Sequence, residues 1–392
     1  CRKNIRDILY QAAKSGFNAV FFQVRGQADA LYKSPYEPWA PQLGSRNPGF
    51  DPLEYALDQA HELGLEFHAY VNAFPLWQGE DKPAYTDPAH LYYSRGPKAG
   101  SKSWVCVDKQ GKPVVEDRYI YLSPGNPEVH AHLRAVISDL VRRYDLDGIH
   151  LDRIRYPSPD SSYDSVSVSR FKGDGNPGSL SWEDWQRDQI TRMVNDIYGS
   201  IQIIRPKVKL TAAVWGIFDT TRLPGYEKFS GGYYKYYQDS RKWLQLGIMD
   251  GLMPMIYWDI PDPKPNYDDL LNDFMKNYSD RHIYGGYQTS YKNFKEIESQ
   301  ILYSRKIGAK GTVAFAASTI DKNRYWRLYK KGIFKQDARI PAMPWKQNPR
   351  SASIIGSVQD KDGKPIMDAG IRISGQPYTW LTSADGFFAC LN

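Results

Sequence analysis

The stretch DGIHLDRIRYP, residues 147–157, combines the strongest fold signal in this chain with its strongest functional signal. Ile149 and Leu151 belong to an apolar run entered through a glycine, which is typical of a strand buried on both faces. Because strand side chains alternate with a period of two, Asp152 shares a face with His150. A carboxylate among apolar neighbours is costly unless it is used or paired. Asp152 is therefore a candidate functional residue, with a structural ion pair as the alternative role.

Short apolar runs of this kind recur through the first 320 residues, each followed by a polar loop and an amphipathic helix. Several runs follow a helix that ends in glycine and a turn, which indicates parallel strands joined by helices. We expect seven strands, within residues 18–26, 65–74, 147–157, 209–218, 250–259, 282–290 and 310–318.

Seven strands preceded by a helix are one short of a closed eight-stranded α/β barrel. We therefore expect a (β/α)₈ (TIM) barrel whose first strand lies upstream of residue 1. An open doubly wound sheet is the alternative, although no GxGxxG phosphate turn accompanies any of the strands. Long insertions after the second and third runs, residues 75–128 and 156–181, follow strand carboxyl ends, where barrels build their functional face.

The composition changes near residue 340. We expect the barrel to span residues 1–340 and a proline-rich linker to span residues 341–351. Residues 352–392 alternate apolar and polar side chains between the turn signals DKDG and SADG, which predicts β-hairpins of a sandwich. About 40 residues are too few for an independent sandwich, so we expect only part of such a domain.

Charge and motifs exclude several functional classes. The net charge of +7 is spread along the chain, which argues against nucleic-acid binding, and no run of about 18 apolar residues offers a membrane span. There is no HExxH, GxSxG or P-loop motif, and the three cysteines lack metal-ligand spacing, so we expect neither a metal nor a cofactor. Helical periodicity directly after Cys1 argues against a lipid anchor there. Oligomeric state is left open.

Aromatic residues make up 14% of the chain, with 29 Tyr and 11 Trp. Such side chains serve either as stacking platforms for sugars or as packing between barrel and helices. Glycosidic bond cleavage requires two carboxyl groups near one anomeric carbon. Beside Asp152, we expect Asp259, at the end of the run 250–259, as a tentative general acid. Asp219 and Glu183 compete with it for that role.

Polar and aromatic side chains near other strand ends complete the predicted site. Arg25 and Asp29 follow the first run within one short loop, where they could hold sugar hydroxyls by charge-assisted hydrogen bonds. His68, Tyr70 and Asn72 share one face of the second run. The residues that we expect to bind substrate are Arg25, Asp29, Tyr32, His68, Asn72, Arg155, Arg187, Trp215, Tyr257 and Trp258.

Five ordered motifs resemble the glycosyl-hydrolase-like family ten: FFQVRGQADALYKS, DPLEYALDQAHELGLEFHAYVN, DGIHLDRIRYP, SWEDWQRDQI and LMPMIYW. The resemblance implies a (β/α)₈ barrel with Asp152 as nucleophile or base at the end of the fourth strand. It also implies an exported bacterial protein, periplasmic, bound to the cell envelope or extracellular, that hydrolyses O-glycosidic bonds of peptidoglycan or another polysaccharide. The alternatives are a non-catalytic carbohydrate-binding barrel and a lyase or transglycosylase.

The C-terminal segment, residues 352–392, resembles a second known domain. The run TSADGFFAC, residues 382–390, is similar to the turn of a carboxypeptidase regulatory-like β-sandwich. The resemblance implies an accessory module of which this chain holds only the start.

Overall fold

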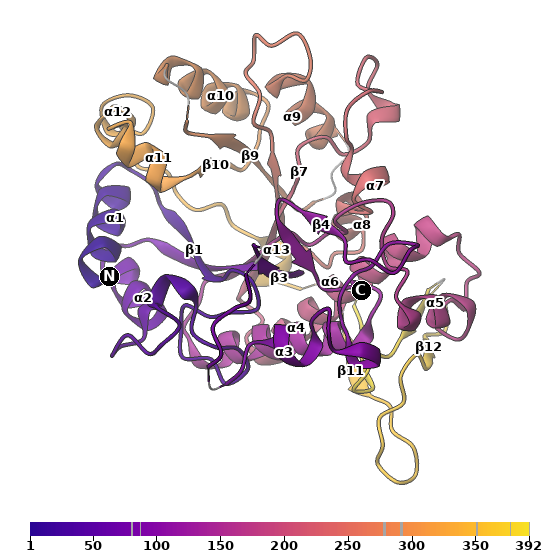
Figure 1. The fold of residues 1–392 in the computed structure, drawn as a ribbon. Coiled ribbons are helices and arrows are strands. Elements are labelled where there is room, and N and C mark those ends of the chain that lie inside the picture. The colour runs from indigo at the N-terminus through magenta and orange to yellow at the C-terminus, as the bar shows by residue number, and fades with distance from the viewer. Residues whose placement is uncertain are drawn as a thin grey trace.

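The computed structural model describes residues 1–79, 81–86, 88–276, 280–290, 293–349, 352–376 and 378–391. Its centre is one parallel sheet of seven strands in the order β1-β2-β6-β7-β8-β9-β10 (Figure 1). The strands are β1 (Ala19–Arg25), β2 (Glu66–Asn72), β6 (Gly148–Asp152), β7 (Lys209–Trp215), β8 (Gly251–Met255), β9 (His282–Gln288) and β10 (Gly311–Phe315). All seven predicted strands are confirmed, and so is their parallel order.

The sheet curls into a half-barrel in a mixed α/β fold, with β1 and β10 as its two outer strands. Each of these two pairs with one strand of the described sheet, β1 with β2 and β10 with β9. Closure into a complete (β/α)₈ barrel is not seen among the described residues and stays a prediction.

Helices cover the outer face of the curl (Figure 1). Several of them begin at a residue whose side chain caps the first turn. The side chain of Asp51 accepts hydrogen bonds from the first turn of α2, and Asn126 and Ser181 do the same for α4 and α6. The longer helices are α1 (Arg2–Lys14), α2 (Pro52–Glu62), α4 (Pro127–Arg143), α6 (Trp182–Ile204), α9 (Tyr267–Lys276) and α10 (Phe294–Lys306). The shorter ones are α7 (Gly232–Lys235), α8 (Ser240–Gln245), α11 (Ala317–Lys322), α12 (Trp326–Lys331) and α13 (Pro344–Gln347). No helix in the described part of the chain is long and apolar enough to cross a membrane.

Alternate side chains of β2 belong to two different layers of the core, one beneath the helices and one inside the curled sheet. Phe67, Ala69 and Val71 are fully buried beneath the helices. His68 and Tyr70 point the other way, into the curl, where their rings meet those of Phe21 and His150. The strand pattern therefore fixes which side chains can reach the inner face.

The first long insertion folds over the carboxyl ends of the strands. It contains α3 (Leu91–Arg95) and a small antiparallel sheet of β3 (Pro75–Gln78), β5 (Tyr119–Tyr121) and β4 (Val115–Glu116). The second insertion carries α5 (Ser165–Lys172). Backbone hydrogen bonds join the first insertion to the loop that follows β2. Leu122 N donates to Phe74 O, for example, over 2.8 Å.

The C-terminal segment forms two small antiparallel pairs. β12 (Gly370–Arg372) and β13 (Thr379–Leu381) are neighbours in sequence, whereas β11 (Ile354–Ser357) pairs with the distant β14 (Phe387–Cys390). β14 packs on α6, and Asn195 of that helix donates to Ala389 O over 2.8 Å. The two pairs agree with the predicted β content of residues 352–392, while a β-sandwich stays a prediction.

Candidate active site

The inner face of the curl is built in layers toward the carboxyl ends of the strands. Phe21 lies lowest, with its ring centroid 4.8 Å from those of both His68 and His150. The next layer is Tyr70, 5.6 Å from His150. Asp152 ends β6 above these rings. The layering places one carboxylate at the mouth of the half-barrel, where α/β barrels carry their active sites.

Both carboxylate oxygens of Asp152 accept hydrogen bonds. The hydroxyl of Tyr70 donates to Oδ2 over 2.5 Å, and the backbone N–H of Arg153 donates to Oδ1 over 2.5 Å. Burial raises the pKa of Tyr70 well above its usual value, and the negative charge of Asp152 raises it further. Tyr70 therefore remains a proton-bearing donor to Asp152 throughout the physiological range.

Tyr257 lies within electrostatic reach of the same carboxylate. Burial raises its pKa, and the charge of Asp152 adds to the effect. Its ring lies against that of Phe315, with the centroids 5.9 Å apart, and its backbone carbonyl accepts from Gln288 Nε2 over 3.1 Å. These contacts from β9 and β10 hold Tyr257 at the mouth, where sequence analysis expects a sugar-stacking residue.

Glu116 of β4 joins two arginines beside Asp152. Arg153 Nη1 lies 3.0 Å from Glu116 Oε2, and Arg155 Nη2 lies 2.8 Å from Oε1. Tyr121 also donates to Glu116 Oε2. A second contact, 3.1 Å long, joins Arg153 to Asp117. The insertion is thereby fastened to the loop that follows β6.

Arg155 continues this cluster toward two aromatic rings. Its guanidinium lies 5.6 Å from the ring centroid of Trp215 and 5.2 Å from that of Tyr236. Trp215 is fixed by its indole N–H, which donates to Ser230 O over 2.6 Å. Trp215 is half-buried and Tyr236 is buried, so of this pair Trp215 is the ring with a face open for stacking.

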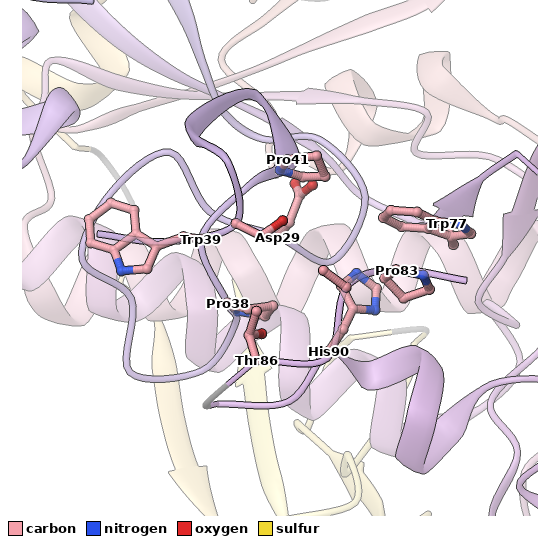
Figure 2. A pocket seen from close by; sticks show the side chains of 10 residues that line it. Asp29, Pro38, Trp39, Pro41, Trp77, Pro83, Thr86 and His90 are labelled. Atoms are coloured by element: carbon pink, nitrogen blue, oxygen red, sulfur yellow. The ribbon is translucent and has the colours of Figure 1, made fainter. Parts of the chain in front are cut away.

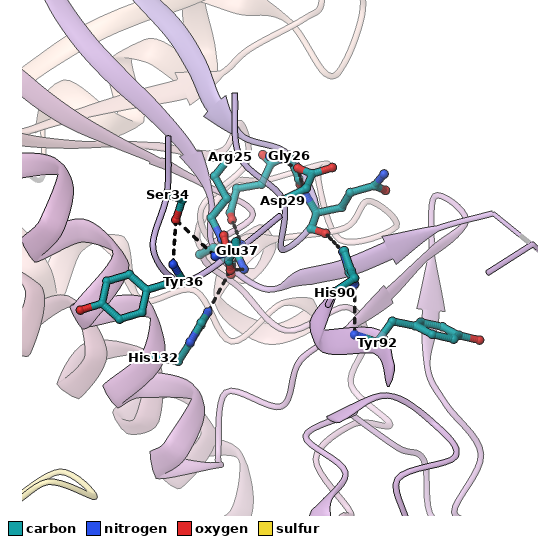
Figure 3. A network of polar contacts seen from close by, with 12 residues as sticks. Arg25, Gly26, Asp29, Ser34, Tyr36, Glu37, His90, Tyr92 and His132 are labelled. Atoms are coloured by element: carbon teal, nitrogen blue, oxygen red, sulfur yellow. Dashed lines mark hydrogen bonds and ion pairs between the residues drawn. The ribbon is translucent and has the colours of Figure 1, made fainter. Parts of the chain in front are cut away.

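Arg25 is buried at the end of β1, in a network shown in Figure 3. Its guanidinium forms an ion pair with Glu37 at 2.8 Å and donates to the carbonyls of Asn72 and Ala73. His132 of α4 lies 2.9 Å from the same carboxylate. Burial alone would raise the pKa of Glu37, but Arg25 and His132 lower it to about 2. The structure thus places Arg25 in a structural ion pair rather than in an open cleft.

Asp29 lies on the loop after β1 and lines a small pocket (Figure 2). Its Oδ1 accepts from the backbone N–H groups of Gly26 and Gln27, both over 3.1 Å. Its Oδ2 is buried without a hydrogen-bond partner. Trp39 and Trp77 form walls of the pocket. His90, another wall, is fixed by donating through Nε2 to Gln27 O over 2.8 Å and accepting from Tyr92 N.

The three carboxylates considered as partners of Asp152 lie in different surroundings. Asp259 is half-buried in the loop after Trp258, and its backbone N–H donates to Asp262 Oδ2 over 2.9 Å. Asp219 Oδ1 accepts from both the backbone and the hydroxyl of Thr221. Glu183 is exposed in the first turn of α6. The structure records no contact between any of the three and Asp152.

The remaining predicted residues are distributed between the mouth and the interior. Asn72 lies at the mouth, in register with Asp152, and its amide donates to Gly26 O over 2.9 Å. His68 lies deep in the curl, 3.4 Å from Glu66. Tyr32 is buried. Arg187 of α6 is bound to Asp184 and to the carbonyl of Tyr233.

Sequence reasoning missed the residues supplied by the first insertion. Glu116 and Tyr119 come from β4 and β5, where no periodic pattern announces that the chain will return to β6. The signal available was charge: two arginines flank Asp152, and buried arginines need a carboxylate. Among the described residues, no group of three His, Cys, Asp or Glu side chains could hold a metal ion.

A half-barrel of parallel strands with a carboxylate at its mouth is the arrangement of a glycoside-hydrolase-like protein. The family model of Glycosyl hydrolase-like 10 matches residues 2–300, and the chain belongs to this family.

Two relatives carry glycosyl hydrolase names. Glycosyl hydrolase YngK of Bacillus subtilis (strain 168) is 27% identical over 414 residues, covering 97% of this chain and 76% of the relative. Glycosyl hydrolase DigH of Escherichia coli (strain K12) is 29% identical over 274 residues, and the match spans 67% of this chain and 60% of DigH.

Solved structures show the same fold at low sequence identity. The glycoside hydrolase domain of PgaB (BpsB) from Bordetella bronchiseptica superposes with a TM-score of 0.60 at 12% identity, over 83% of this chain and 91% of that one. Alpha-L-fucosidase isoenzyme 2 from Paenibacillus thiaminolyticus gives 0.56 at 15% identity, over 92% of this chain and 48% of that one.

Proposed function

We propose that this chain hydrolyses O-glycosidic bonds of a bacterial cell-wall glycan, with Asp152 as the ionised carboxylate of the reaction. The observation that carries the proposal is the position of Asp152 at the mouth, held by Tyr70 and by the backbone N–H of Arg153. Membership of the glycosyl-hydrolase-like family supports the reaction class.

Hydrogen-bond donors and positive charge surround Asp152. It accepts two hydrogen bonds, and the guanidinium groups of Arg153 and Arg155 lie within electrostatic reach. An ionised carboxylate can act as nucleophile or base, or stabilise positive charge that develops on the sugar ring.

Half-buried aromatic side chains supply the surface for the sugar rings. Trp215 ends β7, and Tyr257 and Trp258 follow β8, at the same carboxyl edge of the sheet that carries Asp152 at the end of β6. Their flat faces would stack on pyranose rings, and Arg155 would donate hydrogen bonds to hydroxyl or carboxylate oxygens. We further propose that the protein is exported, because a cell-wall substrate lies outside the cytoplasm.

The test compares the wild type with Asp152→Asn on purified peptidoglycan sacculi and on a panel of neutral and acidic polysaccharides. Hydrolysis releases reducing ends, and the variant should lose several orders of magnitude in turnover while keeping its fold by circular dichroism. Asp7→Asn, an exposed change on α1, serves as the matched control and should behave as wild type.

Three outcomes separate the competing functions. Binding without released reducing ends would identify a carbohydrate-binding barrel. Unsaturated or anhydro sugars as products would identify a lyase or transglycosylase. Near-wild-type turnover in Asp152→Asn would remove Asp152 from the mechanism.

A further inference from the structure

We propose that the exposed ring of Phe315, at the carboxyl end of β10, is a binding subsite for an uncharged pyranose ring of the glycan. This inference rests on the proposed action on a glycan and deepens it. It adds a residue that the sequence patterns do not assign to the site. Phe315 also lies beyond residues 2–300, the part of the chain that the family model matches.

Phe315 is exposed where the rest of the central sheet is not. The structure describes all seven strands in full, and Phe315 is the only residue within them that is exposed, at 56%. Single apolar side chains on an outer surface are common and need no explanation. Phe315, however, ends β10 just as Asp152 ends β6 of the same parallel sheet. Its ring is therefore exposed at the edge where α/β barrels bind their substrates.

The ring of Phe315 leans across the mouth of the half-barrel. It packs on the ring of Tyr257, which follows β8, with the centroids 5.9 Å apart and the planes 16° from parallel. Because β9 lies between β8 and β10, this contact passes over the end of β9. Side chains from alternate strands fill one layer of a barrel interior, and β6, β8 and β10 are alternate strands of this sheet. The contact is the one expected for a layer at the mouth.

Tyr257 connects the ring of Phe315 to Asp152. Burial, followed by the charge of Asp152, raises the pKa of Tyr257. Burial and Asp152 also raise the pKa of Tyr70, and Tyr257 adds to that increase. The two phenols therefore lie within electrostatic reach of Asp152 and of each other, and Phe315 packs on one of them.

The end of β9 holds Phe315 and Tyr257 in place. Phe315 is in register with Gln288, whose Nε2 donates to Tyr257 O over 3.1 Å. The backbone N–H of Thr289 donates to Phe315 O over 2.8 Å. A ring that is already positioned loses less conformational entropy when its ligand binds. The two rings thus form an aromatic surface that exists before a sugar arrives.

The surroundings of Phe315 indicate the class of ligand. Its ring contact is the phenol of Tyr257, which is uncharged at neutral pH. The cations of the mouth, Arg153 and Arg155, are instead paired with Glu116. A phenyl ring has no hydrogen-bonding group, so it can recognise a sugar only through the apolar C–H face of a pyranose. The subsite therefore fits an uncharged sugar such as N-acetylglucosamine.

The experiment measures binding of the N-acetylglucosamine tetrasaccharide by isothermal titration calorimetry, with Asp152→Asn as the parent protein so that no turnover interferes. Adding Phe315→Leu keeps an apolar side chain but removes the flat ring, and we expect binding to weaken about 10-fold. Adding Phe315→Tyr keeps the ring and should preserve the affinity. Tyr10→Ala removes a similarly exposed ring from α1 and is the matched control. Circular dichroism checks the fold of each variant.

Steady-state kinetics with Asp152 intact separates binding from chemistry, on the substrate found in the polysaccharide panel. A stacked sugar is held equally in the ground state and in the transition state. We therefore expect Phe315→Leu to raise KM about 10-fold and to leave kcat within about twofold of the wild type. A fall in kcat with KM unchanged would overturn the subsite, because it would give Phe315 a role other than binding.

The outcomes distinguish the subsite from the proposed function. If the wild type releases no reducing ends from any polysaccharide, the hydrolase function is overturned, while calorimetry still decides whether Phe315 binds a sugar. If the parent does not bind the tetrasaccharide, or if Phe315→Leu binds it as tightly as the parent, the subsite is overturned. Equal losses for Phe315→Tyr and Phe315→Leu would also overturn it, since the ring would then not be the recognised feature.

Discussion

At the scale of single residues, the contact between Tyr70 and Asp152 does the most to define this site. The two side chains come from adjacent strands, and their hydrogen bond is 2.5 Å long. Sequence alternation predicted that His68, Tyr70 and Asn72 share a face, and the ring contacts of His68 and Tyr70 agree. It could not predict which of them meets Asp152, because that depends on the register between β2 and β6.

Tyr70→Phe removes the hydroxyl while preserving the ring packed on His150. Because hydrogen bonds to charged groups contribute about 1.5–3 kcal/mol, we expect kcat to fall by about 10-fold to 100-fold. Steady-state kinetics on the substrate found in the polysaccharide panel measures the loss. Tyr10→Phe, an exposed tyrosine of α1, is the control, and equal rates for all three proteins would contradict a role for the hydroxyl.

Glu37 makes the stability of the folded state depend on pH. Its pKa is lowered from 4.5 to about 2 by Arg25 and His132, against the effect of burial. A lowered pKa in the folded state contributes stability that is present above pH 4.5 and lost as the pH falls toward 2. The shift corresponds to about 3 kcal/mol.

The Glu37→Gln substitution should therefore lower the free energy of unfolding at neutral pH by about 3–5 kcal/mol, because it leaves Arg25 buried without a countercharge. The acid-induced loss of stability between pH 4.5 and pH 2 should also become shallower. Urea denaturation at a series of pH values measures both effects. If the free energy of unfolding of the variant fell with pH as steeply as that of the wild type, other carboxyl groups would be responsible for the loss of stability in acid.

At the scale of elements, strands were predictable and insertions were not. Apolar runs, several of them entered through glycine, marked all seven strands, because a strand buried on both faces needs continuous apolar side chains. The pairing of β4 with β5 depends instead on contacts between Glu116 and the arginines after β6, 37 and 39 residues away. No local pattern encodes such contacts; the two arginines indicated that a carboxylate was needed, but not that Glu116 would supply it.

Glu116→Gln tests the attachment of this insertion. The substitution removes the charge that holds Arg153 and Arg155, so the β4–β5 hairpin should open more often. Arg118 lies exposed in the turn, and we expect trypsin to cleave after it several-fold faster. Mass spectrometry of timed digests identifies the cut. Glu54→Gln, at an exposed position of α2, should leave the rate unchanged, and a similar increase there would contradict the explanation.

At the scale of the whole molecule, the C-terminal segment is fastened to the helical layer. Asp385 pairs with Arg134 of α4, and Asp368 pairs with Arg170 of α5 over 2.7 Å. Between these ion pairs, β14 approaches α6 so closely that a Cβ added to Gly199 would lie 2.4 Å from Ala389 Cβ. The sequence marked a change of composition near residue 340, but it gave no indication of where the tail would dock.

The Gly199→Ala substitution tests whether β14 packs tightly on α6, because a clash with β14 and the higher helix propensity of alanine change stability in opposite directions. In an isolated helix the change would stabilise by about 1 kcal/mol. Here the new methyl meets Ala389, and we expect a loss of about 1–3 kcal/mol in the free energy of unfolding. Thermal denaturation measures it. Adding Ala389→Gly should recover part of the loss, whereas a higher melting temperature for the single variant would show that β14 does not press on α6.

The docking of β14 also has a consequence for cooperativity. Leu381, Ala389 and Cys390 are buried, and a helix of the half-barrel supplies part of the surface that covers them. If α6 unfolds, these side chains of the C-terminal segment become exposed to water. If the C-terminal segment detaches, α6 loses the strand that covers it. Calorimetry should therefore record one heat-absorption peak, with equal calorimetric and van't Hoff enthalpies, for a chain whose composition suggests two independent parts.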